Sequence, residues 1–192
     1  MTNSLAAKWN QRYQGSEVPN RAAQVLRENL HLLPTQGNAL ELACGLGGNA
    51  LLLAQQGLNT EAWDLSEVAL QKLKEFAYQR QLSINTCVAN LGEDPLQQNS
   101  YDVVVVSAFL ERSLCDTIIG ALKPGGLLFY QTFTQEKIGP GGPSNPDFLL
   151  QPGELLQLFS SIDLIAYRQE SNCGDLSQGL RNQAYLVARK PV

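Results

Sequence analysis

The sequence predicts an α/β fold built on one doubly wound sheet. Short apolar runs of strand length alternate with segments of helical periodicity, and Val103-Val-Val-Val106 is an unbroken β-branched run. Such a run is typical of a strand that is buried on both faces of a parallel sheet. The alternating strands are expected at 38–43, 58–64, 83–89, 101–107 and 127–134.

Helices are expected between these strands. A helix over 47–56 ends at Gly57, which can adopt the left-handed conformation of a helix C-terminus. Ser66 caps a helix that runs to about residue 81, and Glu67 lies in its first turn, where the helix dipole favours an acid. Two further helices are expected over 19–33 and 110–122.

The C-terminal third departs from this alternation. A Gly- and Pro-rich loop over 135–152 and a short helix over 153–159 precede two strands, at 162–168 and 184–189. A turn-rich linker joins these strands, which suits an antiparallel pair at the sheet edge. The prediction is therefore a single domain over residues 1–192 with a seven-stranded, mostly parallel sheet.

Composition excludes several classes of function. The chain has 192 residues and a net charge of −4, without a basic cluster, so a nucleic-acid partner is not expected. No apolar run approaches the length of a membrane span, and the N-terminus does not resemble a secretory signal, so a cytoplasmic protein is expected. His31, the one histidine, is interpreted as a helix-end residue. The scattered cysteines, Cys44, Cys87, Cys115 and Cys173, predict neither a metal site nor a disulfide framework.

Residues 39–54 say most about function. An apolar run that contains an acid leads into a glycine-rich turn and then into an apolar helical segment. Gly45 and Gly47 leave room for a ligand to approach the backbone. Asp64 closes a second apolar run about twenty residues further on, where a carboxylate can accept both hydroxyls of a ribose. Together these residues predict a nucleoside site.

Glu41 distinguishes between two cofactor classes that use this arrangement. Gly45-Leu-Gly47-Gly-Asn-Ala50 also satisfies the dinucleotide pattern, but a carboxylate before the turn repels a pyrophosphate at the helix N-terminus. The same carboxylate suits S-adenosylmethionine, which carries an ammonium and a sulfonium group. The stretch resembles motif I of the class I methyltransferases, which implies a Rossmann-like fold and S-adenosylmethionine as cofactor. Ala43 stands where that family often has its first glycine.

Ligands of open α/β sheets bind at the carboxyl ends of the strands, where the strand order reverses. We expect the backbone of 43–47 to face the methionine part of the cofactor, and Leu65 to lie against the adenine. Asn90 can bond the adenine edge, since an amide both donates and accepts, or it can be a turn residue before Gly92. The expected cofactor-binding residues are Trp9, Arg12, Glu41, Ala43, Cys44, Gly45, Gly47, Asn49, Asp64, Leu65, Asn90, Leu91 and Ser107.

The fourth strand ends at Ser107-Ala-Phe-Leu-Glu-Arg112, without the Asn/Asp-Pro-Pro-aromatic motif of methyltransferases that act on amide or adenine nitrogens. With Trp9-x-x-Arg12-Tyr13 and Pro152-Gly-Glu-Leu155, it resembles the small bacterial methyltransferases of the tellurite-resistance type. Arg112 is expected over the pocket mouth, where a guanidinium can bind a substrate oxyanion. The alternative is that Arg112 and Glu111 are solvated charges at a helix start.

Two segments are expected to cover the site. On a helix Trp9 and Tyr13 share a face. Residues 1–18 either pack the N-terminus to the core or form a lid, with the aromatic face at the sulfonium and Arg12 at the methionine carboxylate. The 135–152 loop is expected to cap the substrate, because loops of this length are usually functional or disordered.

The sequence thus predicts an S-adenosylmethionine-dependent methyltransferase that transfers the methyl group in line to a small acceptor, leaving S-adenosylhomocysteine. The acceptor atom is expected to be oxygen, sulfur or another soft nucleophile. The alternatives are an NAD-dependent oxidoreductase and a catalytically silent S-adenosylmethionine-binding protein. The expected catalytic residues are Arg112, Glu111 and Tyr13, and Tyr130 is a further candidate base.

Overall fold

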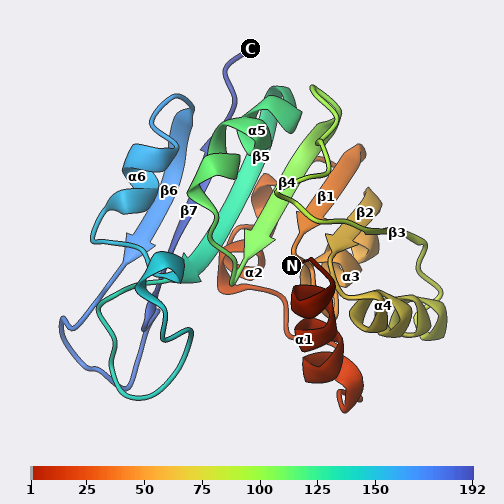
Figure 1. Cartoon of the computed structure of the whole chain (residues 1–192). Helices are drawn as coiled ribbons and strands as arrows, with labels where there is room; N and C mark the ends of the chain where they lie inside the picture. The colour runs from red at the N-terminus through yellow and green to blue at the C-terminus, as the bar shows by residue number, and fades with distance from the viewer. Residues whose placement is uncertain (1) are drawn as a thin grey trace.

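The computed structural model describes residues 2–192, and from Ser4 onward their side chains as well. A seven-stranded sheet forms its centre, in the order β3-β2-β1-β4-β5-β7-β6 (Figure 1). The first five strands are parallel, whereas β7 runs antiparallel to both β5 and β6. The strands are β1 Asn38–Leu42, β2 Asn59–Asp64, β3 Ile84–Val88, β4 Tyr101–Ser107, β5 Leu122–Phe133, β6 Asp163–Gln169 and β7 Gln183–Arg189. The predicted architecture is confirmed.

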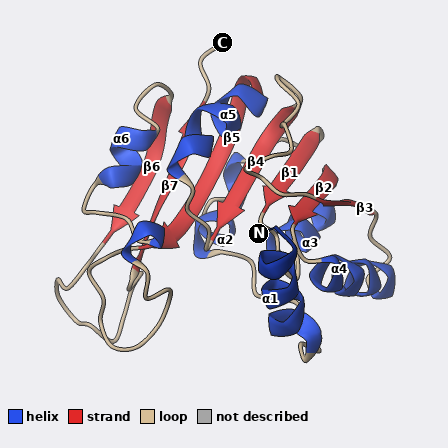
Figure 2. Cartoon of the chain, in the orientation of Figure 1, coloured by secondary structure: helices blue, strands red, loops and turns tan. Residues whose placement is uncertain are grey.

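Helices cover both faces of the sheet (Figure 2). Leu40, Val104 and Leu128 face the side on which α5 (Cys115–Ala121) and α6 (Glu154–Leu158) pack. Alternate residues such as Val103 and Val105 face the other side. Each valine from Val103 to Val106 is fully buried, as the β-branched run predicts. The helices of this second side are α2 (Gln24–Glu28), α3 (Gly48–Gln55) and α4 (Glu67–Gln79).

The leading helix is shorter than predicted. Residues 16–23 are not helical and form an extended segment, called the strap below, before α2 and a 3-10 turn, η1 (Leu30–Leu32). Two backbone N–H groups at the start of α2 bond to side chains of other elements instead of to a preceding helical turn. Asn49 Oδ1 of α3 accepts from Ala23 N, and Gln131 Oε1 of β5 accepts from Val25 N, both over 2.7 Å. The helix predicted over 110–122 likewise begins as a 3-10 turn, η2 (Arg112–Leu114), and becomes α5 at Cys115.

The connection from β3 to β4 has no helix. Residues 89–100 are irregular and cross the sheet on the side of α5, with Leu96 as the buried anchor (Figure 1). The 135–152 loop contains one short turn, η3 (Pro146–Phe148). The N-terminal helix α1 (Thr2–Gln14) lies at the carboxyl ends of β1 and β2 and packs against α4.

The order of the strands reverses between β1 and β4, which places a ligand crevice at their carboxyl ends. Among residues 2–192, no helix is long and apolar enough to cross a membrane. Nor do the described side chains include a group of three or more His, Cys, Asp or Glu that could hold a metal ion.

Candidate cofactor site

The turn after β1 depends on three residues with positive φ: Ala43 at 50°, Gly45 at 52° and Gly47 at 72°. A Cβ on Gly47 would lie 2.3 Å from Leu73 Cδ1, so any side chain there would force the buried Leu73 side chain of α4 to move. Ala43 adopts the left-handed conformation without being glycine, which costs about 1–2 kcal/mol. The chain therefore keeps the sharp turn even where the usual glycine is missing.

Asp64 joins the ends of β2 and β1. Its Oδ2 accepts from Gly45 N over 2.7 Å, and its Oδ1 accepts from Ser66 N over 2.8 Å. Burial raises the pKa of the Asp64 carboxyl, and these backbone donors oppose the rise. Each carboxylate oxygen keeps a second lone pair, so the carboxylate can still accept from other hydroxyls.

The Glu41 side chain, on β1, accepts hydrogen bonds from the first turn of α3. Its carboxylate is 1% exposed and accepts from Asn49 Nδ2 and from Ala50 N, both over 2.7 Å. Burial raises the pKa of Glu41 to about 8, although the hydrogen bonds from Asn49 and Ala50 lower it. A pyrophosphate at this helix would need the same first-turn N–H groups, which argues against dinucleotide binding.

Asn49 connects four segments of the site. Besides its bond to Glu41, its Nδ2 donates to Ser107 Oγ over 2.9 Å, and its Oδ1 accepts from Ala23 N. One side chain therefore ties β1, α3, the end of β4 and the strap together. Asn49 and Ser107 were expected at the cofactor, and the structure brings them to hydrogen-bonding distance of each other.

The N-terminal helix lies over the turn. Trp9 and Tyr13 stack with ring centroids 6.0 Å apart, as their spacing on a helix predicts. The Tyr13 hydroxyl lies only 2.7 Å from the position that a Cβ on Gly45 would occupy. Asn10 Oδ1 accepts from Ser66 Oγ over 2.7 Å and so fastens α1 to the start of α4. Burial, with the nearby Asp64, raises the pKa of Tyr13 to about 12.

A cavity of about 340 Å³ adjoins the turn. This volume is near the lower end of the range for small-molecule sites, about 300–1,000 Å³. The sequence did not predict that the strap, Arg27, Gln131 and Gln183 line it. Gln131 could have been noticed in the sequence, since a polar residue within a buried apolar strand usually has a specific hydrogen-bond partner. The lining residues are Asn20, Arg21, Ala22, Ala23, Gln24, Arg27, Glu41, Cys44, Gly48, Asn49, Ser107, Ala108, Gln131 and Gln183.

Comparison with known proteins agrees with this geometry. Residues 39–126, which include the Gly45 turn, Asp64 and β4, match a family model described as a methyltransferase domain. These residues form a methyltransferase domain. Such a domain makes the chain an enzyme and implies S-adenosylmethionine as its cofactor. A search of curated protein sequences finds no match.

Solved structures share the fold of this chain over nearly its whole length. TehB from Haemophilus influenzae superposes with a TM-score of 0.69 at 22% identity, over 96% of this chain and 66% of TehB. An S-adenosylmethionine-dependent methyltransferase from Methanosarcina mazei gives 0.66 at 18% identity, over 90% and 100%. The [4+2]-cyclase SpnF gives 0.72 at 16% identity, over 98% and 93%. At these identities the likeness establishes the fold alone.

The remaining expected cofactor residues lie just after the ends of β1, β2 and β3. Cys44 is buried and lines the cavity, and burial raises the pKa of its thiol well above the usual value. Leu65 follows Asp64 directly. Asn90 forms a turn in which its Oδ1 accepts from Gly92 N, while Leu91 packs against the core. Whether these residues touch a cofactor stays a prediction.

The expected catalytic residues lie in two places. Tyr13 is at the turn, whereas Arg112 and Glu111 do not line the cavity. Arg112 donates through Nε to Glu154 Oε1 and through Nη1 to Asp147 O, both over 2.6 Å. Glu111 caps η2 by accepting from Ser113 N. The structure thus joins two stretches of the sequence resemblance, residues 107–112 and 152–155, through the Arg112–Glu154 ion pair.

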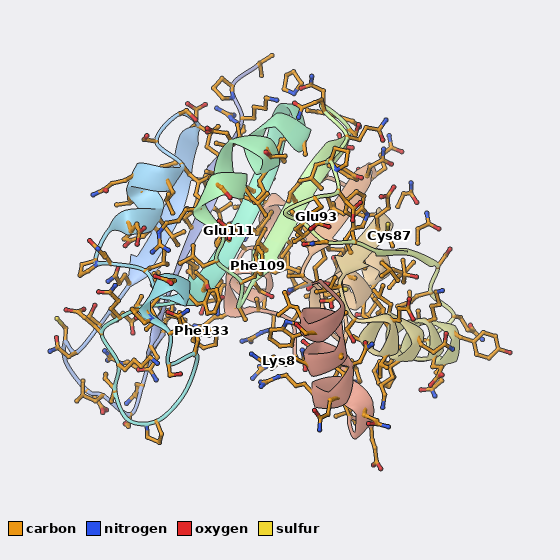
Figure 3. The ribbon with its side chains drawn as sticks, viewed as in Figure 1. Lys8, Cys87, Glu93, Phe109, Glu111 and Phe133 are labelled. Atoms are coloured by element: carbon orange, nitrogen blue, oxygen red, sulfur yellow. The ribbon has the colours of Figure 1, made fainter. Side chains whose placement is uncertain are left out.

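The 135–152 loop rests on the end of β5. A Cβ on Gly142 would lie 2.6 Å from Phe133 Cδ1, so the loop backbone packs against that ring. Figure 3 shows Phe133, Phe109 and Lys8 of α1 toward the carboxyl ends of the strands. Together with the carbonyl groups held by Arg112, these contacts fix the loop beside the site. Its role as a substrate cap stays a prediction.

Proposed function

We propose that the chain transfers the methyl group of S-adenosylmethionine to a small acceptor through an oxygen, sulfur or other soft nucleophile. The observation that carries the proposal is the pair of buried carboxylates at the turn. Asp64 is bonded to Gly45, and Glu41 is bonded to the start of α3. We assign Asp64 to the ribose and Glu41 to the ammonium group, at the strand ends where the fold binds its ligands. The positive charge of the ammonium would favour the ionised form of Glu41, against the burial that raises its pKa to about 8 in the ligand-free chain.

The residues at the turn fit such a cofactor. The Gly45 backbone approaches α1 so closely that a side chain there would meet Tyr13. Asp64 retains lone pairs for hydroxyl donors, and Asn90 offers an amide near the end of β3. When bound, the cofactor would supply both the methyl group and a sulfonium leaving group.

Positioning and exclusion of water are the main contributions that this chain can make. Aligned reactants gain up to about 7–11 kcal/mol over reactants free in solution. Tyr13 is well placed to keep water from the turn, and its pKa of about 12 keeps its hydroxyl protonated at neutral pH. Tyr13 therefore acts as a hydrogen-bond donor rather than as a general base.

The chain offers few bases for the acceptor. Burial also raises the pKa of Tyr130, whose hydroxyl donates to Phe109 O over 3.0 Å beneath the site. The one histidine, His31, lies on η1 and does not line the cavity. These observations favour an acceptor that is already ionised or intrinsically nucleophilic, which needs no general base. The volume of the cavity favours a small molecule.

The test combines binding with turnover. Calorimetric titration should give micromolar affinity for S-adenosylhomocysteine, and NAD should neither bind nor compete. A panel of small thiols, phenols, carboxylates and inorganic oxyanions is then scored for release of S-adenosylhomocysteine and for the methylated product. Binding of NAD in place of S-adenosylhomocysteine would refute the proposal. Tight cofactor binding with no methyl transfer to any member of the panel would favour a catalytically silent binding protein.

A further inference from the structure

The cavity beside the glycine turn extends beyond the crevice between β1 and β4. It continues past the end of β4, where Ser107 lines it, to Gln131 near the end of β5 and Gln183 at the start of β7. In the order of the sheet, β5 and β7 lie two and three strands away from β1. Gln131 and Gln183 are called the amide subsite below, and neither belongs to the turn that we assign to the cofactor.

Hydrogen bonds fix the direction in which the two amides point. Gln131 is 7% exposed, and its Oε1 accepts from Val25 N over 2.7 Å. A backbone N–H can only donate, so the Nε2 of Gln131 faces the other way, where it donates to Gln183 Oε1. The chain of bonds ends at Gln183 Nε2, whose two hydrogens have no acceptor among the described residues.

Ser107 borders the amide subsite and supplies a further donor. Ser107 and Gln131 are register partners on adjacent strands. Ser107 Oγ accepts from Asn49 Nδ2 over 2.9 Å, which leaves its own hydrogen to donate. Within the described chain no side chain or backbone group accepts that hydrogen. The unused hydrogens of this end of the cavity therefore belong to a hydroxyl and an amide that lie on the same face of the sheet.

The surroundings of the amide subsite favour an organic anion. Arg27 lines the cavity, and its Nε donates to Ala22 O over 2.9 Å, which holds the guanidinium beside a strap residue of the same wall. Glu41, the one acid of the lining, is buried and already accepts two hydrogen bonds. Ala22, Ala23 and Ala108 offer small apolar surfaces to the carbon atoms of a ligand. A carboxylate on a small organic molecule meets both the polar and the apolar groups.

We propose that the amide subsite binds a carboxylate group of the methyl acceptor. This inference rests on the proposed function and names its acceptor class, the small organic carboxylates. Gln183 Nε2 and the Ser107 hydroxyl donate to the carboxylate oxygens, and Arg27 supplies the opposite charge. Gln131 orients Gln183 before the acceptor arrives, which lowers the entropic cost of binding. Gln183 is thus a specificity-determining residue.

Pairs of ligands that differ only in charge test the proposal. Propionate, benzoate and mercaptoacetate are each compared with their neutral amides, propionamide, benzamide and mercaptoacetamide. Sulfate and phosphate represent inorganic oxyanions. Ligand-observed NMR titration measures their binding to the chain saturated with S-adenosylhomocysteine, whose own affinity is measured by calorimetry.

Three variants separate the contact from damage to the fold. Gln183→Glu keeps an oxygen for Gln131 Nε2 but replaces the unused donors with a charged acceptor, so it should fold. Gln183→Leu removes the donors without adding charge. Gln157→Glu is the matched control, because it adds the same charge on the exposed side of α6, away from the cavity. Circular dichroism checks the fold of each.

The wild type should bind the carboxylates about tenfold or more tightly than their amides, since hydrogen bonds to a charged group are the stronger ones. Gln183→Leu should abolish most of this preference, and Gln183→Glu should reverse it. Gln157→Glu should keep the wild-type preference. All three variants should bind S-adenosylhomocysteine as the wild type does.

Equal binding of the carboxylates and their amides by the wild type would overturn the inference, and so would an unchanged preference in folded Gln183→Glu. Tighter binding of sulfate or phosphate than of every carboxylate would assign the subsite to inorganic oxyanions instead. If Gln183→Glu weakened S-adenosylhomocysteine as strongly as the carboxylates, the amides would belong to the cofactor and the inference would fall. A wild type that does not bind S-adenosylhomocysteine would refute the proposed function itself.

Discussion

The backbone N–H of Gly45 donates to Oδ2 of Asp64 over 2.7 Å, so one carboxylate holds the turn after β1 against the end of β2. Its other oxygen accepts from Ser66 N, at the start of α4. Asp64 therefore shapes the site before any ligand arrives, in addition to its proposed role at the ribose. A substitution should reveal both roles.

Asp64→Ala should weaken S-adenosylhomocysteine by tenfold or more, because an acceptor of two hydroxyls is lost. It should also lower the free energy of unfolding by about 1–3 kcal/mol, because the N–H groups of Gly45 and Ser66 lose their partner. Asp64→Asn is the control, since it keeps one acceptor oxygen. Titration calorimetry and urea unfolding measure the two effects. Unchanged affinity in folded Asp64→Ala would mean that the ribose is held elsewhere.

Deletion of residues 1–14 should leave a folded domain, because the strands and the other helices all begin after the strap. If α1 is a lid, cofactor affinity and turnover should fall together, since Tyr13 no longer covers Gly45. The melting temperature and the dissociation constant of S-adenosylhomocysteine are measured on the same protein. A lower melting temperature with unchanged affinity would show that α1 only packs the N-terminus to the core.

The stability of the ligand-free protein should fall as pH rises through the titration of Glu41. The pKa of this carboxyl is about 8 in the folded chain, against an ordinary value of 4.5. Between these values the folded state holds a proton that the unfolded state has released, so raising the pH favours unfolding. The slope is at most about 1.4 kcal/mol per pH unit.

Urea unfolding at several pH values measures this slope. Glu41→Gln, which cannot ionise, should be less stable overall but should lose the Glu41 part of the slope. An identical slope in wild type and Glu41→Gln would contradict the assignment.

Arg112→Met should loosen the 135–152 loop, because the guanidinium binds both Glu154 and the carbonyl of Asp147. A double-mutant cycle with Glu154→Gln should give a coupling energy of roughly 1 kcal/mol, as expected for a partly exposed pair. Faster cleavage within the loop by a nonspecific protease is the second measurement. If Arg112 instead serves an acceptor oxyanion, Arg112→Met will raise the acceptor KM while the cleavage rate stays that of the wild type.

Much of the fold could be predicted because its signals are local. The β4 bounds follow from the valine run, and Ser66 caps α4 as its place in the sequence indicates, with Oγ accepting from Ala69 N. The strap could not be predicted, because its backbone partners are distant in sequence. Ala23 bonds to a side chain 26 residues away, and Val25 to one 106 residues away.

The candidate site likewise contains residues that local sequence patterns predict and residues whose partners are distant in the sequence. The positions of Glu41 and Asp64 beside the turn could be predicted, because each stands at a recognisable spacing from the two glycines. The partner of Arg112 lies 42 residues away, and a sequence shows a charge but not what neutralises it. The strap residues that line the cavity gave no signal, because a short polar stretch between two helices looks like any exposed connection.

The three bonds of Asn49 also have a consequence for the newly made chain. Ala23 and Glu41 precede Asn49 in the chain and so leave the ribosome before it. Ser107 follows Asn49 by 58 residues. Until β4 has been synthesised and inserted beside β1, the amide lacks one acceptor and the crevice lacks one wall. The nascent chain should therefore be unable to retain a cofactor until more than half of the polypeptide has emerged, however early the glycine turn itself is made.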